Sequence, residues 1–229
     1  MASIEAKLQQ VRERIALACA AAQRPVQSVT LLAVSKTFAA DAVREAHAAG
    51  QRAFGENYVQ EALAKIDALA SLRPHLEWHL IGPLQSNKTR EVAQSFDWVH
   101  SIDRLKVAER LSAQRPAGMA PLQVCLQVNV SGEASKSGVA PTDLPALARA
   151  VAAMPKLRLR GLMSIPEPVE GFEAQREPHR ALRGLLQGLR NDGLALDTLS
   201  MGMSTDLEAA IAEGATIVRI GTAIFGSRS

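Results

Sequence analysis

Short apolar runs alternate with longer stretches of helical periodicity along this chain. The first run, Val29 to Lys36, is almost entirely apolar or β-branched, which is typical of a strand buried on both faces. Ala39 opens a helical pattern directly after it, and the alternation then repeats to the end of the sequence. The predicted strands cover residues 29–36, 52–56, 77–82, 98–102, 122–130, 157–165, 198–203 and 216–225. The predicted helices cover residues 3–23, 39–49, 59–70, 87–94, 104–113, 142–153, 171–190 and 205–213.

Eight strands that alternate with helices favour an α/β fold, a single (β/α)8 TIM barrel with an extra N-terminal helix. An open, doubly wound sheet is the competing architecture. Closure is favoured because eight units suit a barrel and no Gly-x-Gly-x-x-Gly motif follows the first strand. No linker or low-complexity run divides the chain, so residues 1–229 are expected to form one domain.

Composition and charge narrow the class of protein. The chain is 47% hydrophobic but only 3% aromatic, so its core must be aliphatic, and a net charge of +3 gives no reason to expect a nucleic-acid partner. Cys19 and Cys125 are unclustered, which indicates a reducing compartment without a disulfide framework or zinc site. The early uncharged run Ile15–Ala22 is too short to span a membrane. We therefore expect a cytoplasmic protein without a membrane partner.

Lys36, which closes the first apolar strand, is the first candidate for chemistry. A lysine there is costly to bury as a cation, which favours the free amine. A free amine held on a rigid strand end is what Schiff-base chemistry needs. The structural alternative is a lysine that extends out of the strand end into solvent.

The end of the seventh predicted strand suggests an anion site. In TIM barrels, phosphate is often held by the loops after strands seven and eight. The seventh strand ends in Ser200-Met-Gly-Met-Ser204, and Thr205-Asp-Leu-Glu208 has the pattern of a capping box that opens the next helix. A glycine and hydroxyls before a helix suit a bound anion. Alternatively, Ser204 and Thr205 only cap the helix.

The eighth strand adds an arginine to this region. Arg219 precedes Gly221 and Thr222, and by itself it could equally be a member of a structural ion pair. Together, the two loops and Lys36 predict a phosphate cradle that faces a Schiff-base lysine. That combination implies pyridoxal phosphate (PLP) or, in an aldolase-like enzyme, a phosphorylated sugar. An arginine against a pyridine nitrogen would keep it unprotonated and make the cofactor a weak electron sink.

Other polar residues are weaker candidates. Asn57 ends the second strand, where it could contact a ligand or cap the following helix. Tyr58 is expected to pack at the rim with its hydroxyl exposed. His79 and His100 are expected to be core histidines, since no metal-ligand spacing surrounds them. Lys136 lies in a Gly/Ser-rich loop, either as a solvated charge or within reach of an anionic ligand.

Six sequence blocks carry a family resemblance that covers nearly the whole chain. They are Ala33–Thr37, Phe54–Tyr58, Trp78–Lys88, Gly161–Ser164, Ser200–Ser204 and Arg219–Gly226. As an ordered set they resemble the pyridoxal phosphate homeostasis protein family, whose fold is related to the N-terminal barrel of alanine racemase. The resemblance implies that Lys36 carries PLP as a Schiff base, that Arg219 faces the pyridine nitrogen, and that a further set of residues surrounds the cofactor. Ser200, Ser204, Gly221 and Thr222 are implied around the phosphate, with Asn57 and Met163 or Ser164 near the ring.

Two functions from different classes follow. The resemblance implies a PLP carrier or buffer, expected to be a monomer, that delivers the cofactor to apo PLP-dependent enzymes. The alternative is a PLP-dependent amino-acid racemase or a related enzyme. Racemisation of the alanine racemase type needs a second base, a tyrosine from another domain, whereas this sequence ends at Ser229 and Tyr58 is its only tyrosine. An aldolase-like lyase without PLP is a third, weaker reading.

Overall fold

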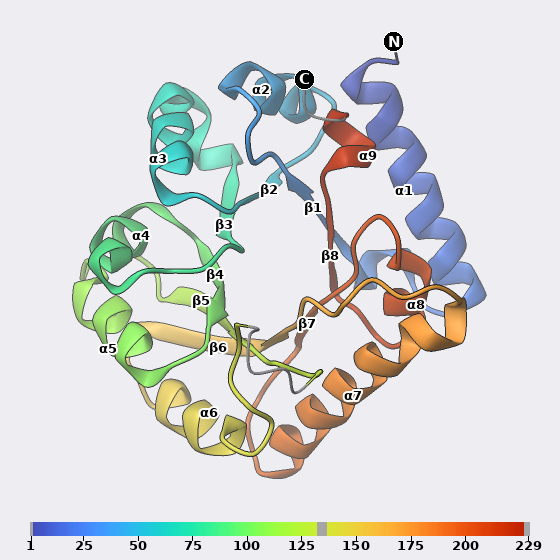
Figure 1. Ribbon diagram of the computed structural model, residues 1–229. Coiled ribbons are helices and arrows are strands. Elements are labelled where there is room, and N and C mark those ends of the chain that lie inside the picture. Colours follow the sequence, from blue (N-terminus) through green and yellow to red (C-terminus); the bar gives the residue numbers. More distant parts are fainter. Residues whose placement is uncertain (1, 132–136, 227–229) are drawn as a thin grey trace.

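The computed structural model describes residues 2–131 and 137–226, and these residues form a closed barrel of eight parallel strands in the order β1 to β8. Helices surround the barrel, and the N-terminal helix α1 packs beside α8 and α9 (Figure 1). The strands are β1 Thr30–Val34, β2 Ala53–Glu56, β3 Glu77–Leu80, β4 Trp98–Ile102, β5 Leu122–Gln127, β6 Leu157–Met163, β7 Thr198–Ser200 and β8 Ile217–Ile220. The α-helices are α1 Ile4–Ala21, α2 Ala40–Ala48, α3 Val59–Ala68, α4 Thr89–Ser95, α5 Leu105–Gln114, α6 Leu144–Ala152, α7 Phe172–Asn191, α8 Leu207–Ala212 and α9 Thr222–Phe225. Short 3-10 helices cover Val26–Ser28, Ala70–His75 and Ser86–Lys88.

The predicted (β/α)8 barrel with an extra N-terminal helix is confirmed, and the open sheet is excluded because β8 pairs with β1. The predicted strand over 216–225 is wrong in its second half. The strand ends at Ile220, Gly221 takes a non-extended conformation, and Thr222–Phe225 form the short helix α9. Apolar side chains there satisfy a helix as well as a strand, since Ile224 and Phe225 are buried in the layer that α1 covers.

Two apolar layers hold the barrel together. The larger layer lies between the strands and the surrounding helices, where alternate strand residues such as Ala33 and Phe54 meet helix residues such as Leu8. The smaller layer fills the barrel itself and includes Leu32 and Val34 of β1. This division follows from the strand period of two, which places neighbouring side chains on opposite faces of the sheet.

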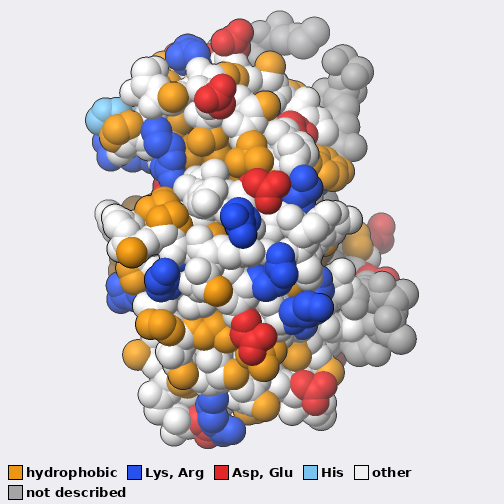
Figure 2. Space-filling view, turned by 90° about the vertical axis from the view of Figure 1, so that its left-hand side faces the viewer, with side chains coloured by type: hydrophobic (Ala, Val, Ile, Leu, Met, Phe, Trp, Pro, Cys, Tyr) orange, Lys and Arg blue, Asp and Glu red, His pale blue; other side chains and the backbone are white. Residues whose placement is uncertain are grey.

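The surface shows no single charge type on the face that Figure 2 presents. Lysine and arginine side chains lie among acidic ones there, in keeping with the small net charge. Among the described residues, no helix combines the length and the apolar character that crossing a membrane requires.

Candidate functional site

A cavity of about 480 Å³ lies where the loops after β1, β7 and β8 meet. Its position matches the carboxyl end of the strands, where TIM barrels carry their sites. Six of the nine predicted site residues line it, namely Lys36, Asn57, Ser204, Arg219, Gly221 and Thr222. The other residues that line it are Val34, Ile81, Ile165, Met203 and Thr205.

Lys36 follows β1 in a tight turn. The strand ends at Val34, and the Phe38 amide donates to the Ser35 carbonyl at 3.1 Å, which closes the turn around the lysine. Thr37 adopts a φ of +68°, a left-handed conformation that β-branched residues rarely take. Lys36 is half-buried rather than buried, so its side chain reaches the cavity while keeping access to solvent.

An ionic network of Glu56, Glu61 and Lys65 supports this turn from one side. The Lys65 ammonium group donates to Glu56 Oε1 at 2.7 Å, to Glu61 Oε1 at 2.6 Å and to the Ser35 carbonyl at 2.6 Å. Both Glu56 and Lys65 are buried. Burial raises the pKa of Glu56 above its ordinary value, and the nearby Lys65 charge opposes that shift only in part.

The same network also holds the other side of the turn. Glu61 accepts a hydrogen bond from the Thr37 amide at 2.5 Å. The backbone is therefore fixed immediately before and immediately after Lys36, through Ser35 and Thr37. Among the described residues, no hydrogen bond or ion pair joins the network to the Lys36 side chain. This arrangement positions the lysine and leaves its amine available.

Arg219 enters the cavity from β8 with two anchors. Its Nη1 donates to Ser200 Oγ at 2.9 Å and its Nη2 donates to the Ser164 carbonyl at 2.8 Å. Burial lowers the pKa of Arg219 to about 10, and the more distant Asp206 charge opposes the shift. Among the described residues it forms no ion pair, so the structural ion-pair reading does not apply.

Three predicted site residues lie behind Arg219 and do not line the cavity. Ser200 is fully buried and bonds Arg219, Ser164 is held through its carbonyl by the same guanidinium, and Met163 is part of the apolar layer inside the barrel. The Ser164 hydroxyl is buried without a partner among the described residues. In this structure Ser164 and Ser200 act on the cavity through Arg219.

The loop after β7 is held by the Asp206 side chain, not by the predicted capping box. The residue before α8 is Asp206, and the helix begins at Leu207, so Thr205 is not the cap. Asp206 Oδ1 instead accepts from the Met203 amide at 2.7 Å. Glu208 does not turn back to the cap because it pairs with Arg14 of α1. The simple capping alternative therefore fails too, and Ser204 and Thr205 remain at the cavity wall.

Asn57 also lacks the capping role that was its structural alternative. Tyr58 precedes α3 and makes no side-chain cap. The Asn57 Oδ1 atom is buried without a hydrogen-bond partner among the described residues, although its residue lines the cavity. Gly82 packs against its backbone so closely that a Cβ there would lie 2.2 Å from the Asn57 carbonyl oxygen. A buried amide oxygen without a partner, on a backbone that is packed this closely, is suited to a ligand's donor group.

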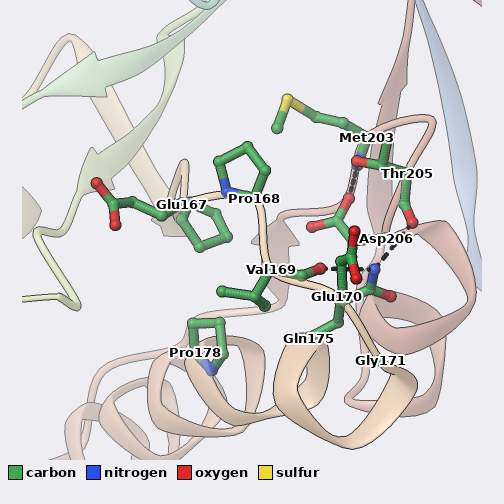
Figure 3. A pocket seen from close by; sticks show the side chains of 11 residues that line it. Glu167, Pro168, Val169, Glu170, Gly171, Gln175, Pro178, Met203, Thr205 and Asp206 are labelled. Carbon is green, nitrogen blue, oxygen red and sulfur yellow. Dashed lines mark hydrogen bonds between the residues drawn. The ribbon is translucent and has the colours of Figure 1, made fainter.

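A neighbouring cavity of about 490 Å³ has a different character (Figure 3). It lies between the loop 166–171 and the start of α7, and shares Met203 and Thr205 with the first cavity. Its Gln175 amide is already engaged, because Nε2 donates to the carbonyls of Val169 and Thr205. Its lining residues carry neither an amine nor a guanidinium group. The cavity at Lys36 is therefore the better candidate for the functional site.

The remaining sequence predictions have mixed outcomes. Tyr58 is exposed at the rim, as predicted, and His79 and His100 are buried in the core. The described residues contain no cluster of His, Cys, Asp and Glu that could hold a metal ion. Cys19 and Cys125 are free, and Lys136 lies outside the described residues.

Sequence reasoning missed the ionic network and the contact between the two core histidines. Glu61 and Lys65 are four residues apart on α3, a spacing that predicts a surface pair but not its burial against Glu56. His79 and His100 lie on adjacent strands, and their 2.9 Å contact depends on a stagger between β3 and β4 that the sequence does not reveal.

Comparison with known proteins finds relatives that match over nearly the whole chain. The family described as alanine racemase, N-terminal domain, matches residues 6–229. A pyridoxal phosphate homeostasis protein of Pseudomonas aeruginosa is 64% identical over 228 residues, covering 100% of this chain and 97% of that protein. The protein of the same name from Escherichia coli K12 is 54% identical over 229 residues, covering 100% and 98%.

A solved structure agrees with these sequence relatives. PipY of Synechococcus elongatus, determined with PLP bound, superposes with a TM-score of 0.86 at 41% identity, and the match covers 98% of this chain and 100% of that one. These matches extend over the whole barrel, including the cavity at Lys36. The chain therefore belongs to the alanine racemase N-terminal domain family and, within it, to the pyridoxal phosphate homeostasis proteins.

Proposed function

We propose that this protein binds PLP on Lys36 and serves PLP homeostasis by storing the cofactor and releasing it. The observation that carries the proposal is one cavity that brings together a primary amine, a buried guanidinium group and the hydroxyl-bearing residues of two loops. The names of the relatives and the PLP-bound structure of PipY support the same ligand.

The residues of the cavity fit PLP group by group. Lys36 would hold the cofactor through its amine, a nucleophile suited to a reversible Schiff base with an aldehyde. The hydroxyl groups of Ser204 and Thr222 would donate hydrogen bonds to the phosphate, near the backbone N–H groups that begin at Gly221. The orphaned Asn57 oxygen would accept from a ring substituent. When bound, PLP supplies the electrophilic aldehyde and the electron-withdrawing ring.

Arg219 favours a carrier over an enzyme. A guanidinium group cannot give its proton away to a pyridine nitrogen in the way a carboxylic acid can, so it donates a hydrogen bond and leaves that nitrogen unprotonated. An unprotonated ring stabilises a carbanion poorly, while reversible binding to Lys36 is unaffected. The relatives are named for homeostasis and not for a reaction, which supports the same reading.

Covalent binding is tested by absorbance and trapping. Protein mixed with PLP should develop a visible absorbance band, and borohydride should fix the label to the peptide that contains Lys36. Lys36→Ala should lose both signals. Lys88→Ala, at the half-buried lysine that precedes α4 and pairs with Glu91, should keep them. A full band in Lys36→Ala, with the label elsewhere, would contradict the assignment.

The carrier role is tested against the enzyme alternative. Loaded protein should reactivate an apo PLP-dependent enzyme, the predicted recipient class. The same protein should exchange no α-proton of common amino acids in deuterated water, because each missing acid or base group costs about 10²–10⁴-fold in rate. Rapid exchange that depends on Lys36 would establish the racemase-like alternative instead. A monomeric state and a cytoplasmic location remain predictions from the sequence.

A further inference from the structure

A continuous line of hydrogen bonds crosses the interior of the barrel to reach Arg219. Glu77 Oε1 lies 2.7 Å from His79 Nε2, and His79 Nδ1 lies 2.9 Å from His100 Nε2. His100 Nδ1 lies 2.8 Å from Ser200 Oγ, which accepts from Arg219 Nη1 at 2.9 Å. We refer to these five residues, drawn from β3, β4, β7 and β8, as the histidine chain.

The two ends of the histidine chain have different surroundings. Glu77 begins β3 at the amino-terminal end of the barrel, in an open cleft, with its side chain 49% exposed. Arg219 lines the cofactor cavity at the opposite end. The three residues between them are almost completely excluded from solvent. The histidine chain therefore joins the solvated Glu77 carboxylate to the Arg219 guanidinium group at the cavity.

The hydrogen positions along the chain follow by elimination from both ends. Arg219 has donors only, so Ser200 Oγ accepts from it. At the other end, the hydrogen bond from His79 lowers the pKa of Glu77, which is therefore an ionised acceptor at neutral pH, and His79 Nε2 carries the hydrogen. Arg160 and Arg73 are the cations that face Glu77 and add to this effect.

The middle of the histidine chain then follows from the Ser200 hydroxyl and the His100 ring. Burial, with smaller contributions from His79 and Arg219, holds the pKa of His100 well below its ordinary value, so its ring carries one hydrogen. Ser200 Oγ accepts from Arg219, so its own hydrogen is donated to His100 Nδ1, which lies 2.8 Å away. The single hydrogen of His100 is then on Nε2, which donates to His79 Nδ1. Every hydrogen bond points from Arg219 toward Glu77.

We propose that Glu77, His79 and His100 are positioning residues for the cofactor, because their one-way hydrogen bonds make Ser200 present a lone pair to Arg219. This anchor, with the Ser164 carbonyl, uses two of the five guanidinium N–H groups and fixes the Arg219 side chain in the wall of the cavity. The inference rests on the proposed function only where it assigns the occupant of that cavity as PLP.

The direction of the chain can be measured in the apo protein. Nitrogen-15 NMR of the imidazole rings, assigned with His79→Gln and His100→Gln, should show both rings as Nε2–H tautomers. The opposite direction would place the His100 hydrogen on Nδ1, as would happen if a doubly protonated His79 donated to it. An Nδ1–H tautomer of His100 at neutral pH would overturn the proposal. This readout does not depend on PLP.

The control of Arg219 is tested at the solvated end, which avoids any change in the core. Glu77→Leu removes the terminal acceptor, so His100 should become a mixture of tautomers. PLP should bind about threefold to tenfold more weakly, the effect of about one neutral hydrogen bond, and its absorbance band should shift. Glu77→Gln keeps an oxygen acceptor and should restore the tautomer and most of the affinity.

A matched control separates this role from a general effect of surface charge. Glu91→Leu removes a similarly exposed carboxylate from α4 and should change neither the His100 tautomer nor the band. Unchanged tautomer and affinity in Glu77→Leu would overturn the proposal. If both rings show the predicted tautomers but the protein does not bind PLP, the proposed function is wrong. The hydrogen-bond direction that anchors Arg219 is supported in that case.

Discussion

Two buried polar networks support two different residues of the same cavity, and they use different chemistry. The ionic network beside β1 pairs a buried cation with two carboxylates, whereas the buried middle of the histidine chain, which ends at Arg219 of β8, consists of two imidazoles and a hydroxyl. The ionic network bonds to backbone on both sides of Lys36, while the histidine chain bonds to the Arg219 side chain itself. The ionic network therefore fixes the backbone around Lys36, and the histidine chain fixes the side chain of Arg219.

The difference shows how a site can hold one group loosely and another firmly. A nucleophilic amine has to form and break a covalent bond, so its backbone is fixed and its side chain is left available. A group that sets the protonation of a ring has to stay in place, so its side chain is fixed directly. A buried charge costs desolvation energy even when paired, whereas a neutral chain costs little once every donor has an acceptor.

The largest predicted effect is the loss of the buried cation. Lys65→Met leaves Glu56 buried without its charged partner and releases the Ser35 carbonyl, so the free energy of unfolding should fall by about 3–5 kcal/mol. Urea denaturation of the apo protein measures this. Lys88→Met, which breaks a surface pair, should cost less than about 1 kcal/mol.

A compensating substitution sharpens this first prediction. Adding Glu56→Gln to Lys65→Met removes the unpaired carboxylate, and more than half of the lost stability should return. If the double variant is no more stable than Lys65→Met, the lost stability comes from the released Ser35 carbonyl. The unpaired Glu56 carboxylate would then not explain why the ionic network matters more than the histidine chain.

Removing His100 from the histidine chain should lower the free energy of unfolding by less than removing Lys65 does. His100→Leu leaves the Ser200 hydroxyl hydrogen without its acceptor and one nitrogen of His79 without a partner, which corresponds to about 1–3 kcal/mol in the free energy of unfolding. His47→Leu, at a half-buried histidine of α2, is the matched control and should cost less. A loss in His100→Leu greater than that in Lys65→Met would reverse the ranking of the two networks.

The extent to which the sequence predicts this molecule depends on the range of the interactions. Strand and helix order follow from local periodicity, and the cavity residues follow from their places after the strands, which is why Lys36 and Thr222 were found together. The end of β8 was missed because apolar side chains at 222–225 suit either a strand or a helix against α1. Contacts such as Glu56 to Lys65 require the curvature of the closed barrel, which has no local pattern.

The two networks should also respond to pH with opposite signs. Burial raises the pKa of Glu56 above about 4.5, so the stability of wild type relative to Glu56→Gln should decrease as the pH rises from that value through the raised pKa. The hydrogen bond from His79 lowers the pKa of Glu77, so the stability of wild type relative to Glu77→Gln should increase as the pH rises through the lowered pKa toward about 4.5.

Denaturation curves of the three apo proteins between pH 3 and 7 test this, with slopes of at most about 1.4 kcal/mol per pH unit for one group. The informative quantity is the difference between wild type and each variant, since other carboxylates cancel. Equal signs for the two differences would mean that burial does not outweigh the Lys65 charge at Glu56.

The smallest predicted effect concerns the cavity lysine itself. Lys36 is half-buried and, among the described residues, has neither a hydrogen bond nor an ion pair, so Lys36→Met should change the free energy of unfolding of the apo protein by no more than about 0.5 kcal/mol. The same substitution should abolish covalent PLP binding. Lys65→Met is the natural contrast, because it changes a lysine that supports the fold and leaves the amine in the cavity. A loss of several kcal/mol in Lys36→Met would make Lys36 a structural residue and would remove the distinction between the side chain that reacts and the network that holds its backbone.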